Sequence, residues 1–168
     1  MGQDTLVEGF GLTKSWLQDR LEEKHHCRPT VQKVEPLGPE AIGYLSVIRR
    51  VQLEWDCNKS DLPDSIIVKI PCTAKVSDAF EKSTGNKTSE EQMGIMQKSM
   101  HNTETRFYRV VQYEDPKPLL VPVIYAAEDC SSKQPVIVMQ DYRDCHVADH
   151  KKGFSEKQVQ LVLLTESQ

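Results

Sequence analysis

Hydrophobic and polar residues follow a helical period near the start of the chain. Thr13 or Ser15 can cap the short amphipathic helix that this pattern predicts. Its apolar positions are Leu12, Trp16, Leu17 and Leu21.

The period then changes to the alternation of strands. The stretches TVQKVEPLG (30–38) and GYLSVIRRVQLEW (43–55) both alternate, and the turn between them contains Gly38 and Gly43. We expect the two strands to pair as a hairpin. The second strand has an apolar face, formed by Leu45, Val47, Val51, Leu53 and Trp55, and a polar face, formed by Ser46, Arg50, Gln52 and Glu54.

A third strand, SIIVKIP (65–71), contains one cation, Lys69, among apolar residues. Alternation puts Lys69 on the same face as Ile67, so the charge interrupts only one face of the strand. That face should look onto a negative group. Three consecutive strands joined by short polar turns predict an antiparallel meander.

The segment 88–112 has the clearest helical pattern, and Thr88 with Glu91 satisfies a capping box. Its apolar stripe consists of Met93, Met96, Met100, Phe107 and Val111. The step of seven from residue 100 to 107 skips one inward position, and helical spacing assigns that position to Glu104.

The sequence therefore places a carboxylate in the stripe of a helix and a cation in an apolar strand. Burying either charge alone costs several kcal/mol, and pairing the two offsets much of that cost. We predict that Lys69 and Glu104 meet. The alternatives are a Lys69 that extends to solvent at a strand edge, and a Glu104 that pairs with Lys98 or Arg106.

Two further apolar runs, 118–129 and 134–142, flank the polar turn CSSK and bring the predicted sheet to about five strands. A short helix is expected within 76–87. A last helix follows a cap at Ser155, with an apolar face of Val159, Val162 and Leu163. The predicted fold class is α+β, with helices packed on one antiparallel sheet.

Composition limits the classes of function. At 168 residues and 19.2 kDa, with 38% hydrophobic and 27% charged residues, the chain fits one globular domain or part of a larger one. A net charge of -4 argues against general binding to nucleic acid or to an anionic membrane surface. No apolar run reaches the roughly 18 residues of a membrane span, and the N-terminus lacks a signal pattern, so we expect a cytoplasmic protein.

The five cysteines form an odd set without a C-x-x-C pair, so we expect reduced thiols rather than a disulfide framework. Zinc binding at His25-His26-Cys27 or at Cys145-His146 is not expected, because adjacent ligands give poor tetrahedral geometry.

A strand lysine paired with a helix glutamate beneath a glycine-bearing hairpin is how kinase-type folds hold the phosphates of ATP. The chain resembles the ecdysteroid-kinase-like, choline-kinase-like family of small-molecule kinases. The resemblance rests on four stretches in family order: GYLSVIRRVQLEW, IIVKIP, NTETRFYRVV and PVIVMQDY. They lie within residues 10 to 165.

The resemblance implies roles for individual residues. Gly43 and Ser46 would belong to the hairpin that covers the phosphates, Lys69 would contact the phosphates, and Glu104 would orient it. Met139, Gln140 and Tyr142 would form the hinge that holds adenine, through backbone groups of Gln140 and Tyr142. Gln140 stands where the family usually has an acidic residue.

The resemblance also implies ATP and Mg²⁺ as cofactors and a small-molecule alcohol as the acceptor. However, transfer requires an H-x-D-x-x-x-x-N segment and a further aspartate for magnesium, and the sequence contains no asparagine after Asn102. We therefore expect a single truncated domain, with a nucleotide-binding N-terminal lobe at 10–142 and a linker plus the start of the catalytic lobe at 143–168. The magnesium ligands would lie in the missing lobe.

A second hypothesis comes from a different class of protein. The chain as written could be a non-catalytic, kinase-like interaction module or a truncated isoform, with an apolar surface exposed where a second lobe would dock. The glycines at 38 and 43 do not discriminate, because hairpins often contain glycine for turn geometry alone.

Overall fold

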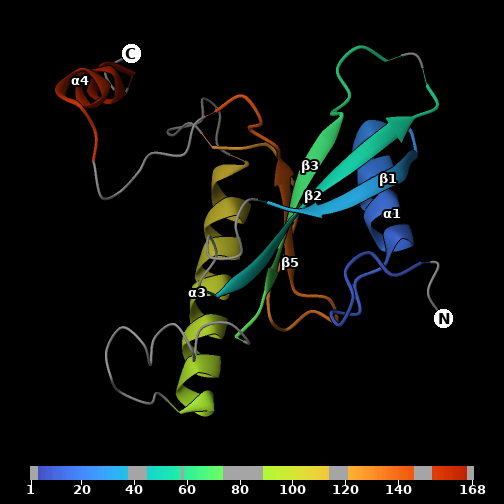
Figure 1. Ribbon diagram of the computed structural model, residues 1–168, viewed down its shortest axis with the longest axis horizontal. Helices are drawn as coiled ribbons and strands as arrows, with labels where there is room; N and C mark the ends of the chain where they lie inside the picture. Colours follow the sequence, from blue (N-terminus) through green and yellow to red (C-terminus); the bar gives the residue numbers. More distant parts are fainter. Residues whose placement is uncertain are drawn as a thin grey trace.

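Five strands form one antiparallel sheet in the order β1-β2-β3-β5-β4, as the computed structural model shows (Figure 1). Residues 4–37, 45–57, 59–73, 89–113, 121–145 and 153–165 are described, with side chains up to residue 160 in the last range. The strands are β1 (Pro29–Pro36), β2 (Ser46–Trp55), β3 (Ser65–Pro71), β4 (Ile124–Glu128) and β5 (Val136–Gln140). The predicted meander of the first three strands is confirmed.

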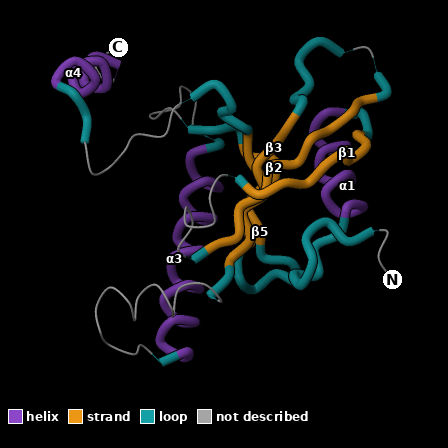
Figure 2. The backbone as a smooth tube through the Cα atoms, in the orientation of Figure 1, coloured by secondary structure: helices purple, strands orange, loops and turns teal. Residues whose placement is uncertain are grey.

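Helices α1 (Lys14–His25) and α3 (Glu90–Val111) lie on opposite sides of this sheet (Figures 1 and 2). A third helix, α4 (Glu156–Thr165), lies apart from the sheet (Figure 1). The predicted α+β fold, with an N-terminal helix and a glutamate-bearing helix packed on five strands, is thereby confirmed. Gly38, Gly43 and the short helix expected within 76–87 fall outside the described residues.

The main hydrophobic core lies between α1 and the sheet. Thr13 is the N-cap of α1, because its hydroxyl accepts a hydrogen bond from the Trp16 amide at 3.1 Å. Leu17 and Leu21, one helical turn apart, are fully buried. They pack on the inward-facing strand residues Val47, Val51, Leu53, Ile66, Val68, Ile70, Val136 and Val138.

The register between β2 and β3 decides which residues share the other face of the sheet. Ile48 lies opposite Lys69, and Arg50 lies opposite Ile67. On the next strand, Met139 lies opposite Ile67. Side chains directly opposite each other in an antiparallel pair point to the same side, so Arg50, Lys69 and Met139 share the face on which α3 packs.

The cysteine prediction is wrong for one pair. Cys27 and Cys57 form a disulfide, with their Cα atoms 6.6 Å apart, whereas Cys72, Cys130 and Cys145 are free. The β1–β2 register explains the pairing. Pro29 lies opposite Trp55, so the residues two positions beyond this pair on each strand face each other.

The caps of the later helices agree with the predictions in one case and differ in the other. Ser155 caps α4 as expected, accepting a hydrogen bond from the Gln158 amide at 3.3 Å. In α3 the N-cap is Ser89, whose hydroxyl accepts from the Gln92 amide at 3.2 Å, and not Thr88. Ser89 has the extended backbone that a cap requires, so the helix begins one residue later than the capping-box pattern indicates.

Among the described residues, no helix is both long and apolar enough to span a bilayer.

Candidate functional site

Lys69 and Glu104 form the ion pair that the burial argument predicts. The Lys69 ammonium lies 2.7 Å from Glu104 Oε1 and 2.6 Å from Oε2, so both carboxylate oxygens accept from it. About a quarter of each side chain is exposed, 24% for Lys69 and 28% for Glu104. An ammonium has three N–H donors, so one donor remains for an anion that reaches this face.

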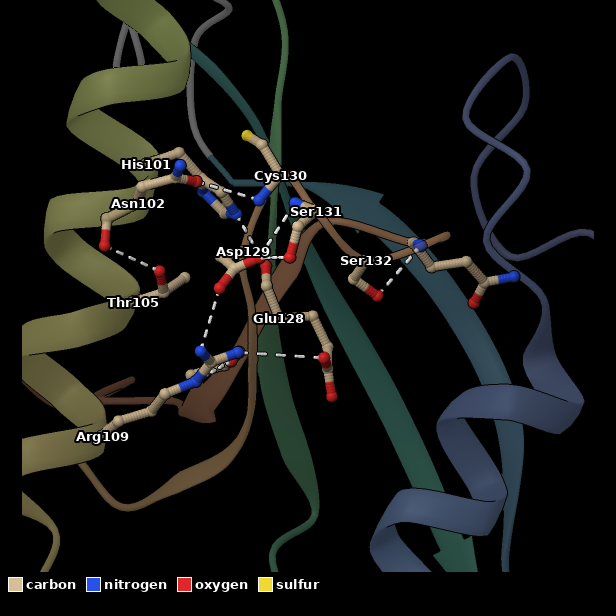
Figure 3. A network of polar contacts seen from close by, with 11 residues as sticks. His101, Asn102, Thr105, Arg109, Glu128, Asp129, Cys130, Ser131 and Ser132 are labelled. Atoms are coloured by element: carbon tan, nitrogen blue, oxygen red, sulfur yellow. Dashed lines mark hydrogen bonds and ion pairs between the residues drawn. The ribbon is translucent and has the colours of Figure 1, made fainter.

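Glu104 is carried by a helix that polar contacts fix to the β4–β5 edge of the sheet (Figure 3). His101 is buried, and its Nε2 lies 2.8 Å from the carbonyl of Glu128. Asn102 accepts a hydrogen bond from the Cys130 amide at 2.9 Å. Because a carbonyl only accepts, Nε2 donates to it, and Nδ1 is buried with no hydrogen-bond partner among the described residues.

Arg109, in the last turn of α3, makes further contacts with β4 and the β4–β5 turn (Figure 3). Its Nε donates to the carbonyl of Ala127 at 2.8 Å, and its Nη1 lies 3.0 Å from Asp129. The hydroxyl and the amide of Ser131, followed by Arg109, lower the pKa of Asp129 to about 2. The β4–β5 turn is thus held in one conformation by the same residues that hold α3.

The predicted apolar stripe of α3 is wrong over its middle. Met93 and Val111 are buried as expected, but the side chains between them that are buried are His101 and Thr105. The outward-facing apolar residues of the helix are Ile95, Met96, Met100, Phe107 and Val110. The polar contacts of His101, Asn102 and Arg109 fix the rotation of the helix so that Met96 and Met100 are exposed. Glu104 lies at the border of the buried face.

The other predicted site residues lie around the same face. Ser46 begins β2 opposite Pro71, and Met139 lies opposite Ile67. Gln140, the last residue of β5, has its side chain on the opposite face, where Oε1 accepts from the Val123 amide at 3.2 Å. Tyr142, just beyond the strand, is exposed. The backbone amide of Gln140 donates to the carbonyl of Val123 at 2.8 Å, and its role in holding adenine stays a prediction.

Sequence reasoning missed a second ion pair on this face. Arg50 donates from Nε to Asp141 Oδ2 at 2.6 Å and from Nη2 to Oδ1 at 3.0 Å. The Ser65 hydroxyl donates to Asp141 Oδ2 at 2.6 Å. The available signal was the position of Arg50 on the polar face of its strand, but nothing in the sequence indicates which carboxylate it meets.

A cavity of about 420 Å³ lies beside this cluster, and Lys69 and Glu104 do not line it. Its walls include His25, Tyr125, Gln140, Asp141 and Arg143. In the part of the chain that the structure describes, no group of three His, Cys, Asp or Glu side chains could hold a metal ion.

Comparison with known proteins identifies a family. Residues 21–165 match the model of a family of unknown function, DUF1679, described as "Uncharacterized oxidoreductase dhs-27". The chain belongs to this family. No curated protein and no solved structure matches the chain.

Proposed function

We propose that this chain is the ATP-binding lobe of a kinase-like phosphotransferase that transfers phosphate from ATP to a hydroxyl group of a small molecule. The observation that carries the proposal is the Lys69–Glu104 ion pair. A carboxylate that accepts two of the three ammonium donors fixes the direction of the third, and a lysine oriented in this way contacts phosphate oxygens in kinase folds.

The other residues of the face have supporting roles in this proposal. Ser46, with Gly43 before it, would cover the phosphates, where backbone N–H groups can approach an anion closely. Met139, Gln140 and Tyr142 would bound the base where β5 ends. Bound Mg²⁺ would neutralise charge on the phosphates, and its ligands are expected from a catalytic lobe that these 168 residues do not include.

The test is nucleotide binding by the chain, measured by calorimetry with ATP and Mg²⁺. We expect Lys69→Met to weaken binding by about tenfold or more, since it removes the contact to the phosphates. Lys33→Met is the matched control, because Lys33 lies on β1 with its side chain largely exposed and pairs with Glu35 on the same strand. Equal affinity of the wild type and Lys69→Met for ATP would refute the proposal.

A second candidate is supported by the exposed apolar residues of α3. In this alternative the chain is a non-catalytic, kinase-like interaction module, and Met100 and Phe107 belong to its docking surface. Calorimetry with ATP separates the two, because ATP binding that Lys69→Met weakens supports the nucleotide-binding lobe, whereas a folded chain that does not bind ATP supports the interaction module.

The family description names an oxidoreductase, but the observed sheet does not favour one that uses a dinucleotide. Dinucleotide-binding folds are built on parallel strands joined by crossover helices. Every strand pair in the described part of this chain is antiparallel. A hydride-transfer assay with nicotinamide cofactors would test this alternative directly.

The sequence leads us to propose a cytoplasmic location, whereas the Cys27–Cys57 disulfide of the structure favours an oxidising compartment, so the location can be tested directly. Disulfides persist mainly in oxidising compartments. Thiol labelling of the protein from rapidly quenched cells should find five reactive cysteines if the location is cytoplasmic. Only three labelled cysteines would place the chain in an oxidising compartment.

A further inference from the structure

The Arg50–Asp141 ion pair lies at the point where the chain leaves the sheet. The β3–β5 ladder ends with Ile66 opposite Gln140, so Asp141 is the first residue beyond it. The Asp141 side chain is only 4% exposed, although it belongs to a connecting segment. Its two oxygens accept from Arg50 on β2, and one of them also accepts from Ser65 at the start of β3.

Arg143 extends the cluster from the segment itself. Its Nη2 donates to the Ser65 hydroxyl at 2.9 Å, and its Nε lies 3.8 Å from Asp141 Oδ2. Burial raises the pKa of Asp141, but hydrogen bonds from Arg50 and Ser65 and the charges of both arginines outweigh this effect, so the pKa lies below its ordinary value. The carboxylate is therefore charged at neutral pH and holds the segment through charge-assisted hydrogen bonds.

The cluster lies on the same face of the sheet as Lys69. Arg50 is opposite Ile67, and Lys69 is two residues further along β3, a spacing of about 7 Å in a strand. A ligand that contacts Lys69 and extends along β3 toward the end of β5 would meet the backbone of residues 140–142. Arg50 and Ser65 occupy both oxygens of Asp141, so this carboxylate is engaged within the cluster and the backbone is what the segment presents to such a ligand.

Stability alone is a weak reason for such a pair. A buried ion pair costs desolvation energy, and apolar residues of similar volume often replace it without loss of stability. The more general effect of such a pair is on the geometry of the two segments it joins, because a bidentate arginine–carboxylate pair fixes distance and orientation together. Within the β3–β5 ladder, backbone hydrogen bonds fix the path of the chain. Beyond its end, the Arg50–Asp141 pair fixes the path of residues 141–142.

We propose that the pair of Arg50 and Asp141 is a clamp that positions the backbone of residues 140–142 as the edge that binds the base of the nucleotide. This inference rests on the proposed function and assigns the phosphates and the base of the nucleotide to different groups of residues. Lys69 holds the phosphates, whereas the clamp acts only on the base through the backbone it positions. Arg50 and Asp141 are positioning residues and do not contact the nucleotide.

The experiment compares ATP with inorganic tripolyphosphate, which has the phosphates but no base, as ligands of the intact chain. Arg50→Met should weaken ATP binding by about tenfold and leave tripolyphosphate binding within about twofold of the wild type. Lys69→Met should weaken the binding of both ligands. Arg50→Lys, which keeps the charge, should recover part of the ATP affinity.

The matched control is Arg49→Met. Arg49 is the neighbouring arginine on β2, points to the opposite face and donates to the carbonyl of Ile48. It should bind both ligands like the wild type. If Arg50→Met does not unfold cooperatively, Asp141→Asn replaces it, because asparagine keeps the shape and removes the charge.

Hydrogen exchange gives a readout that does not depend on nucleotide. The amides of residues 140–145 should exchange faster in Arg50→Met than in the wild type or in Arg49→Met, and the amides of β1 should be unchanged. Unchanged exchange at 140–145 would overturn the clamp, whatever the chain binds.

The two proposals fail in different ways. If the wild type binds ATP and tripolyphosphate with equal affinity, or if Arg50→Met binds ATP as well as the wild type does, the clamp is refuted while the role of Lys69 stands. If the wild type binds neither ligand, the proposed function fails and the clamp loses its assigned role with it.

Discussion

Helices α1 and α3 cover opposite faces of one sheet, but they are held there by different forces. α1 buries Leu17 and Leu21 completely in an apolar core. α3 is fixed by hydrogen bonds that His101, Asn102 and Arg109 make with the β4–β5 edge, while Met96 and Met100 remain exposed. Apolar burial is tolerant of small shifts, whereas hydrogen bonds fix a helix in rotation and register. The helix that carries Glu104 is therefore the one whose rotation and register are fixed by hydrogen bonds.

The largest expected effect comes from the core of α1. Leu21→Ala should lower the free energy of unfolding by about 3 to 5 kcal/mol, because it removes buried methyl groups and leaves a cavity. Met96→Ala on α3 should change the free energy of unfolding by less than about 0.5 kcal/mol, since Met96 is exposed. Urea unfolding of both variants checks this. A similar loss of unfolding free energy in Leu21→Ala and Met96→Ala would show that α3 is also held by apolar burial.

The next effect concerns the end of α1, which the disulfide joins to the β2–β3 turn. Cys27→Ser should lower the free energy of unfolding by about 3 kcal/mol, because the bond closes a loop with a sequence separation of 30 and restricts the unfolded chain. Cys145→Ser, at an exposed free thiol, is the control. The comparison is made without reductant. In excess dithiothreitol the wild type should fall to the level of Cys27→Ser.

A smaller effect is expected from the polar anchors of α3. Asn102→Ala should lower the free energy of unfolding by about 1 kcal/mol, since it removes the acceptor for the Cys130 amide. Thr103→Ala is the neighbouring control, because the exposed Thr103 hydroxyl donates to the carbonyl of Ser99 within the same helix. The same variants test the geometric argument, since Asn102→Ala should increase hydrogen exchange in α3 more than Leu21→Ala does at equal temperature below unfolding.

The smallest effect depends on pH. The pKa of Asp129 is about 2 in the folded state and near 3.8 when unfolded, so the charged form stabilises the fold. That stability is fully present above pH 3.8 and is lost as the pH falls through 2. Asp129→Asn should therefore be slightly less stable than the wild type at pH 6, and the difference should shrink as the pH falls from 3.8 towards 2 and vanish below it, as measured by urea unfolding across this range. A difference that stays constant with pH would contradict the assigned pKa.

The elements of this fold could be predicted from periodicity, but the contacts between distant elements could only partly be predicted. The strands and α1 follow directly from the spacing of residues such as Leu17, Leu21 and Val51. The contact of Lys69 with Glu104 was predicted correctly, but from a stripe that is wrong in its middle. The cost of burying two opposite charges was the sounder part of that argument.

Two features could not be predicted because they depend on register or on long-range packing. Cys27 meets Cys57 only because Pro29 pairs with Trp55, and alternation of residues predicts a hairpin without fixing which residues are opposite. The Arg50–Asp141 pair joins residues 91 positions apart. Both residues read as ordinary surface charges until the β3–β5 ladder brings their strands together.

That ladder has a consequence for how the molecule folds. The meander β1-β2-β3 and the hairpin β4-β5 each consist of contacts between strands adjacent in sequence, and only four residue pairs, from Ile66–Gln140 to Lys69–Ile137, join the two units within the sheet. Contacts of high sequence separation are paid for in loop-closure entropy and tend to form late. The Arg50–Asp141 pair crosses this seam, and the Lys69–Glu104 pair joins β3 to α3, which hydrogen bonds attach to the β4–β5 hairpin. The site is therefore assembled by the last and least local step of folding, and we expect partial opening along the seam to disperse it while each unit keeps its own structure.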